Sequence, residues 1–470
     1  MEKKIIAGFI LCFFFGTFMS NTSAQEYKYD INNYYTPDIV RNSLDINFNL
    51  NDNISNRKTP FDSSEINIFN WNMNPTFVRY RNTRNQITTF SIGGATNGSL
   101  QNNNKINNGD FYKSTNTQNN LSINYSSYFY NLKHIYLMLK ASGNYDGSFI
   151  KRINYANTLE TNTLENQNTY YLKSYIGVGK GRIESVTDAR QAVYILDQLS
   201  KKDKITRTLN GNEIFKFAQT ISKVKNKRFL DARLHRIEEI TTVDSFLVAN
   251  EYLTNQDAAY FTTLYDFWEY GALYDRSSGQ RFEINFSPDV YFFNSLFKPE
   301  TLNTGNRRND LEYKVEMNLI YKYEKVVDLN WQHSFTGGLN FHISDLLNET
   351  IYDSDILQKT KVTTIGGTFD ANYNLSYYPS TRSKFTLFAN QVNIFDFNDH
   401  MTINDLERPK NQTINMTSRI GVSADYYFSP QLRLSGGAGI GYNYDSYSSN
   451  NTVNKYLSAG IGASISYSFF

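Results

Sequence analysis

Cysteine, proline and histidine are scarce in this chain of 470 residues, which has one, eight and five of them. The single cysteine, Cys12, lies in an apolar N-terminal segment. The rest of the chain therefore offers no thiol for a disulfide, a thiolate metal site or a cysteine nucleophile. The histidines are dispersed, and no two have the spacing of a zinc-binding pair. We expect no metal site, no cofactor and no catalytic residues.

A strong charge and a long apolar run are also missing. The formal net charge is +2, which gives no argument for a nucleic-acid partner. After the N-terminal segment no run of 18 apolar residues occurs, so no membrane-spanning helix is expected. Tyrosine (36) and phenylalanine (34) are nevertheless abundant, while the mean hydropathy is negative. Many aromatics in a hydrophilic chain are typical of a membrane β-barrel with an apolar lipid face and a polar lumen.

The N-terminus has the layout of a secretory signal peptide. Lys3 and Lys4 precede an apolar run from Ile5 to Met19, and small residues end at Ala24. A membrane anchor is the alternative, but the run is shorter than the roughly 20 residues of a spanning helix. We predict that residues 1–24 are removed after export.

Apolar and polar residues alternate with period two in many later segments. In one of them, the apolar residues Phe282, Ile284, Phe286, Pro288 and Val290 alternate with Glu283, Asn285, Ser287 and Asp289. Successive side chains of a strand point to opposite faces, so such segments predict strands with one apolar and one polar face. A soluble β-sandwich would show the same alternation, but the length of the segments and the C-terminal pattern described below favour a transmembrane antiparallel β-barrel.

Fourteen candidate strands can be placed, with 12 as the alternative count because the first is short. They are 43–51, 67–82, 85–97, 117–131, 133–147, 168–180, 278–292, 310–323, 327–341, 360–377, 383–394, 411–427, 430–444 and 454–469. Barrels of this kind have short periplasmic turns and long extracellular loops. The spacing predicts periplasmic termini and long outer loops such as 99–116, 147–167, 295–309, 344–359 and 395–410.

One periplasmic connection breaks this rule. Residues 181–277 have helical spacing of apolar residues, and Asn210 with Glu213 forms a capping box. We predict a small α-helical periplasmic subdomain there, inserted between a first barrel half (25–180, about six strands) and a second half (278–470, about eight strands). Folding of the insertion into the lumen as a plug is the alternative.

Charged residues on the polar faces are candidates for lining the lumen, where they could set selectivity. The alternative is that opposite charges pair across a closed lumen. The candidate lumen-lining residues are Arg281, Glu283, Asp289, Glu312, Lys314, Glu316, Asp370, Arg419, Asp425 and Arg433. His333 and Ser334 invite comparison with a lipase dyad, but adjacent strand residues point to opposite faces, so no enzyme is expected.

The last strand ends in alternating apolar residues followed by an extra aromatic. Tyr467, Phe469 and Phe470 resemble the C-terminal signature that the barrel-assembly machinery reads. With the segments 181–184 (Gly-Arg-Ile-Glu) and 188–190 (Asp-Ala-Arg), the chain is similar to porin-like outer-membrane β-barrel proteins of the Bacteroidota. The resemblance implies a barrel with an inserted helical region in contact with outer-membrane lipid. It implies no particular activity.

Two functions fit these expectations. The first is a porin-like pore for small solutes in the bacterial outer membrane. The second is a structural, assembly or export-system component whose helical insertion, 181–277, docks a periplasmic protein partner.

Overall fold

A computed structural model describes residues 30–58, 63–105, 111–131, 134–156, 159–227, 232–299, 305–352, 355–448 and 452–468. The predicted signal peptide 1–24 and the terminal residues Phe469 and Phe470 lie outside the described residues.

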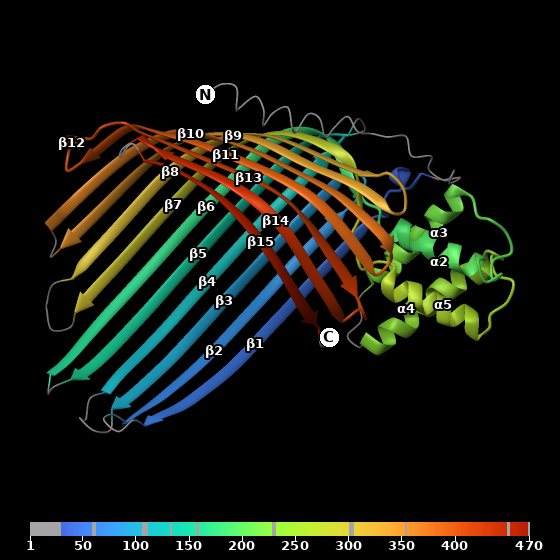
Figure 1. Cartoon of the computed structure of the whole chain (residues 1–470), viewed down its shortest axis with the longest axis horizontal. Helices are drawn as coiled ribbons and strands as arrows, with labels where there is room; N and C mark the ends of the chain where they lie inside the picture. Colours follow the sequence, from blue (N-terminus) through green and yellow to red (C-terminus); the bar gives the residue numbers. More distant parts are fainter. Residues whose placement is uncertain are drawn as a thin grey trace.

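The chain forms one antiparallel sheet in which each long strand pairs with the next along the sequence (Figure 1). A two-residue strand, β12 (Leu406–Glu407), pairs with β11 beside this path. The long strands are β1 (Ile39–Lys58), β2 (Ser63–Asn82), β3 (Gln86–Lys105), β4 (Phe111–Tyr130), β5 (Ile135–Ala156), β6 (Leu159–Ser185), β7 (Ser277–Pro299), β8 (Asn306–Val326), β9 (Trp331–Tyr352), β10 (Asp355–Ser380), β11 (Ser383–Ile403), β13 (Asn411–Tyr427), β14 (Leu432–Tyr447) and β15 (Thr452–Tyr467).

These 14 long strands confirm the predicted count and the all-β barrel class with a helical insertion. The sheet is strongly curved, and β1 and β15 stand at the two ends of the strand order. Because the number of antiparallel strands is even, these edge strands run in opposite directions. That is the relation an antiparallel pair needs to close the wall.

The two faces of the sheet are inverted relative to those of a soluble protein. On β7, Phe282, Ile284 and Phe286 are 45%, 38% and 48% exposed. Between them, Glu283, Asn285 and Ser287 are only 1%, 3% and 0% exposed. We call the face with the buried polar residues the inner face. An apolar outer face over a polar inner face is the arrangement of a membrane barrel.

Aromatic contacts lie towards both ends of the apolar outer face. Tyr170 contacts Tyr145 and Phe292, with ring centroids 5.0 Å and 6.1 Å apart. Near the opposite end, the ring centroids of Trp331 and Tyr377 lie 4.5 Å apart. Such pairs resemble the aromatic girdles that flank the apolar band of membrane barrels.

The strands are longer than predicted, and the predicted long outer loops are wrong. β3 ends at Lys105 and β4 begins at Phe111, so most of 99–116 belongs to strands. The same holds at 147–167, where β5 ends at Ala156 and β6 begins at Leu159. These extensions carry polar residues on both faces, so no alternation marks them. Backbone pairing nevertheless continues through them, as Asn56 opposite Glu65 illustrates.

Among the residues that the structure describes between β6 and β7, four helices lie at one end of the wall (Figure 1). The predicted boundary at 181 falls inside β6, which continues to Ser185. The Asn210–Glu213 capping box is formed at the start of the second helix. The helices are α2 (Thr187–Ser200), α3 (Gly211–Lys225), α4 (Ala232–Ala249) and α5 (Ala258–Tyr270). Among the helices that the structure describes, none is long and apolar enough to span a bilayer.

The helical subdomain shares its core with the wall. Its buried side chains, such as Phe217 and Leu264, cluster with Ile31 and Tyr34 from the segment before β1 and with Val326 at the end of β8. The short helix η1 (Ile31–Asn33) adds a polar tie, since Asn32 Nδ2 donates to the Val326 carbonyl at 2.8 Å. The subdomain is therefore packed onto the wall rather than tethered by two linkers alone.

Candidate functional site

The inner face of β6–β8 carries a compact group of ion pairs. Lys173 Nζ lies 2.8 Å from Asp289 and 2.7 Å from Glu316, and Lys314 Nζ lies 2.7 Å from the same glutamate. Asp289 and Glu316 are buried, so water screens these contacts less than it would at an open surface. Two lysines face two carboxylates, and the group is close to neutral.

A second group surrounds Glu283, which is also buried. Its carboxylate accepts a hydrogen bond from Tyr136 Oη at 3.2 Å and lies 3.6 Å from Lys140 and 3.7 Å from Arg281. Asn285 Nδ2 donates to the other carboxylate oxygen at 3.0 Å. The carboxylate is thus held by one phenol, one amide and two cations, which fixes its position on the wall.

The ten predicted lumen-lining residues share the inner face but do not form one site. Arg281, Glu283, Asp289, Lys314 and Glu316 belong to the two groups above, and Glu312 lies on the same face of β8 beyond Lys314. The remaining four lie farther round the wall or at its helix end. Asp370 lies over Gly338 and Arg419 lies over Gly441. The Asp425 carbonyl accepts from Tyr274, and Arg433 lies over the Tyr427 ring.

Three residues that complete these groups are not among those predicted from the sequence: Lys140, Lys173 and Tyr136. The alternation could have placed two of them on the inner face, because Lys140 and Tyr136 share one face of the predicted strand 133–147. Lys173 likewise falls within the predicted strand 168–180. Alternation places the side chains inward, but it does not say which acid each lysine meets.

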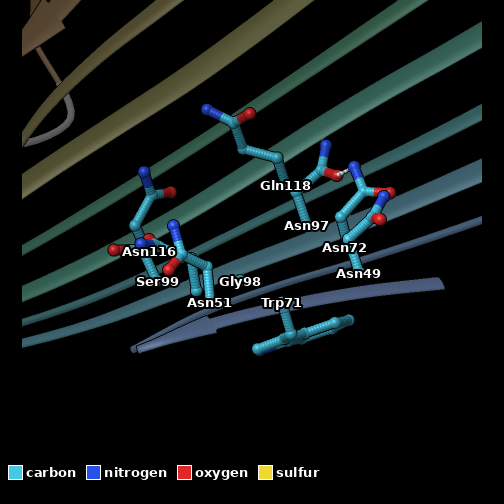
Figure 2. A pocket seen from close by; sticks show the side chains of 10 residues that line it. Asn49, Asn51, Trp71, Asn72, Asn97, Gly98, Ser99, Asn116 and Gln118 are labelled. Carbon is cyan, nitrogen blue, oxygen red and sulfur yellow. Dashed lines mark hydrogen bonds between the residues drawn. The ribbon is translucent and has the colours of Figure 1, made fainter. Parts of the chain in front are cut away.

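The inner face of β1–β4 is different, because amides replace the charges. Asn49, Asn72, Asn97 and Gln118 are cross-strand neighbours in one row. With a second row they line a shallow hollow of about 300 Å³ (Figure 2). Trp71 points to the opposite side of the sheet, where its ring covers Gly98 (Figure 2). The wall around these amide rows is therefore neutral and hydrogen-bonding, whereas the β6–β8 sector is ion-paired.

The helix end of the inner face is covered by a floor built from α2 and the segment before β7. The Tyr378 ring, on β10, lies 4.7 Å from the guanidinium carbons of both Arg190 and Arg276. Tyr274 Oη donates to the carbonyls of Arg382 and Asp425, at 3.1 Å and 3.2 Å. These contacts join the helical subdomain to the inner faces of β10 and β13.

Arg276 is the best-anchored part of this floor. Its Nη1 donates to the Leu329 carbonyl at 2.6 Å, and its Nη2 donates to the Trp331 carbonyl at 2.7 Å. Its Nε donates to Gln332 at 2.9 Å. Burial, and secondarily the nearby Arg190 charge, lowers the pKa of Arg276 to about 10, so it stays protonated at neutral pH.

His333 and Ser334 point to opposite faces. His333 Nδ1 contacts Tyr373 Oη at 2.7 Å on the outer face, while Ser334 Oγ donates to Glu324 at 2.5 Å on the inner face. Nothing in this arrangement brings the hydroxyl to the imidazole.

No protein-family model and no curated protein matches the sequence. Among solved structures, the transport unit of the autotransporter AIDA-I from Escherichia coli has a TM-score of 0.28 at 12% identity, over 82% of this chain and 91% of that one. The translocator domain of the autotransporter NalP from Neisseria meningitidis has a TM-score of 0.23 at 9% identity, over 92% and 88%. TM-scores and identities this low support no functional argument. The resemblance to Bacteroidota proteins stays a prediction.

Proposed function

We propose that this chain is an outer-membrane β-barrel that passes small polar solutes along its inner face. The observation that carries the proposal is the inversion of the two faces: exposed aliphatic and aromatic side chains alternate with buried acids and amides. Exposure of that apolar outer face to water would be unfavourable, whereas lipid would cover it. The polar inner face supplies the hydrated lining that a solute pathway needs.

The floor gives this pathway a point of control. Tyr378 and the side chains stacked on it cover the end of the inner face beside the helices. Full-length protein in a planar bilayer should therefore show stepwise conductance, raised by Tyr378→Ala. Tyr377→Ala is the matched control, because its ring packs against Trp331 on the outer face. No conductance steps with wild-type protein or Tyr378→Ala would rule out the pore.

Orientation can be tested separately by cysteine labelling, since the native chain has no cysteine beyond Cys12. Lys201, after α2, and Glu407, in β12, are exposed and lie at opposite ends of the wall. On intact cells a membrane-impermeant maleimide should label Glu407→Cys, and it should label Lys201→Cys only after the outer membrane is permeabilised. The reverse pattern would overturn the proposed orientation.

A second function is favoured by one feature of the helices. Ile237 and Val248 on α4 and Phe261 and Tyr265 on α5 are exposed apolar or aromatic side chains. Such side chains are typical of protein-binding surfaces. A docking role predicts that Phe261→Ser and Tyr265→Ser together abolish capture of a periplasmic partner and leave conductance unchanged. Equal capture by wild-type and doubly substituted protein would remove the support for this role.

A further inference from the structure

Arg190 is a buried cation with donors left over. The side chain is 1% exposed, and its Nη2 donates to Tyr194 Oη at 3.2 Å. Its Nε and Nη1 are buried and have no hydrogen-bond partner. The guanidinium carbon lies 4.9 Å from the Tyr194 ring and 4.7 Å from the Tyr378 ring. The aromatic contacts fix the group while its unused N–H donors stay unsatisfied, which is a costly state for buried charge.

No acid of the floor neutralises this charge. Within the part of the chain that the structure describes, neither Arg190 nor Arg276 forms an ion pair, and the four donor contacts of Arg276 go to carbonyls and an amide. Lys384 adds a third cation, 5.9 Å from the Tyr378 ring.

Three nearby carboxylates have other partners, and Asp275, next to Arg276 in the chain, is exposed. Asp328 accepts from the backbone amides of Asn330 and Trp331, and Asp266 pairs with Arg382 at 3.0 Å. The Asp425 side chain accepts from Ser435 Oγ at 2.6 Å. The floor thus concentrates positive charge around one tyrosine ring without a matching acid on that ring.

We propose that Arg190 is the centre of an oxyanion-binding site in the floor, for a carboxylate or phosphate group of a small solute. A guanidinium presents planar N–H donors that match both groups. Arg276 and Lys384 add a favourable field. Both open nitrogens are closed from solvent in this structure, so the anion enters by displacing the half-buried Tyr194. The site does not depend on the pore, because binding is measured on purified protein whether or not it conducts.

The test is calorimetric titration of full-length protein in detergent, with inorganic phosphate and with succinate, at constant ionic strength in chloride. Wild-type protein should bind at least one of the two more tightly than chloride, and which one binds identifies the oxyanion. Arg190→Gln should weaken binding tenfold or more. Arg382→Gln is the matched control, because Arg382 contacts Tyr274 of the same floor but already has an acid partner; it should bind like wild type.

Equal affinity in wild type and Arg190→Gln, or no binding beyond chloride, would overturn the proposal. If Arg190→Gln does not fold, Arg190→Lys serves instead, since it keeps the charge but loses the planar set of donors. It should then bind several-fold more weakly than wild type, and unchanged affinity would equally contradict the site.

Discussion

Two adjacent residues on β4 test the assignment of the faces. Ile123 is 41% exposed on the outer face, with Leu121 two residues before it and Ile92 opposite it on β3. Asn124 points inward, between Ser91 and Ser142 in the strand register. Ile123→Arg would put a charge in the apolar band, which costs about 2–4 kcal/mol near the bilayer midplane. Asn124→Arg would put the same charge on the polar face, where we expect about 1 kcal/mol or less.

The assay is equilibrium folding into lipid vesicles across a urea series, which gives the free energy of unfolding of each variant. A loss of 2–4 kcal/mol corresponds to a roughly 30- to 700-fold lower folding equilibrium constant for Ile123→Arg. Similar small losses for both variants would show that this face does not meet lipid. A larger loss for Asn124→Arg than for Ile123→Arg would show that the inner and outer faces are exchanged.

Three further predictions concern charge, backbone and pH. Lys173→Met leaves Asp289 and Glu316 with fewer cations, so the reversal potential in a salt gradient should shift towards cation selectivity. Gly181→Ala should lower the free energy of unfolding by about 1–3 kcal/mol, because Gly181 has φ +100° and a Cβ would meet the Gln280 carbonyl. Hydrogen bonding to Arg207 lowers the pKa of Glu213 from 4.5 to about 2. Its contribution to helix stability is therefore present above pH 4.5 and lost as the pH falls towards 2, as helical circular dichroism of wild type and Glu213→Gln should show.

The first two of these predictions have a control on another strand of the sheet. Lys361→Met, on β10, should leave selectivity closer to wild type than Lys173→Met does. Gly460→Ala should be nearly neutral, because no atom lies within 4 Å of its added Cβ. Equal effects within either pair would contradict the reasoning. A Glu213→Gln variant with the wild-type acid response would show that the Arg207 contact is not the cause.

The sequence predicts the strands wherever one face is apolar and the other is polar. The stretch from Phe282 to Val290 is recognisable for that reason, and the polar ends of the hairpins are not. The alternation of side chains along the strands also places Glu283 and Lys173 on the inner face. It cannot give the pairing of Lys173 with Asp289, because the helical insertion separates β6 from β7 in sequence and only the fold sets their register.

The floor could not be predicted from the sequence, for a different reason. Arg190, Arg276 and Tyr378 come from a helix, a short connecting segment and the end of a strand. None belongs to a local pattern that marks it as functional. Only tertiary packing stacks the two arginines on one ring.

The strand extensions change where the molecule meets its surroundings. β6 has 27 residues, which at about 3.3 Å each gives roughly 90 Å of strand. With a tilt of about 45° this is roughly 60 Å of height, against an apolar band of about 25 Å. In the proposed orientation, much of the wall extends beyond the lipid on the extracellular side. Antibodies and phage would contact the ends of the hairpins first. Sequence changes at these ends would leave the residues of the apolar band undisturbed.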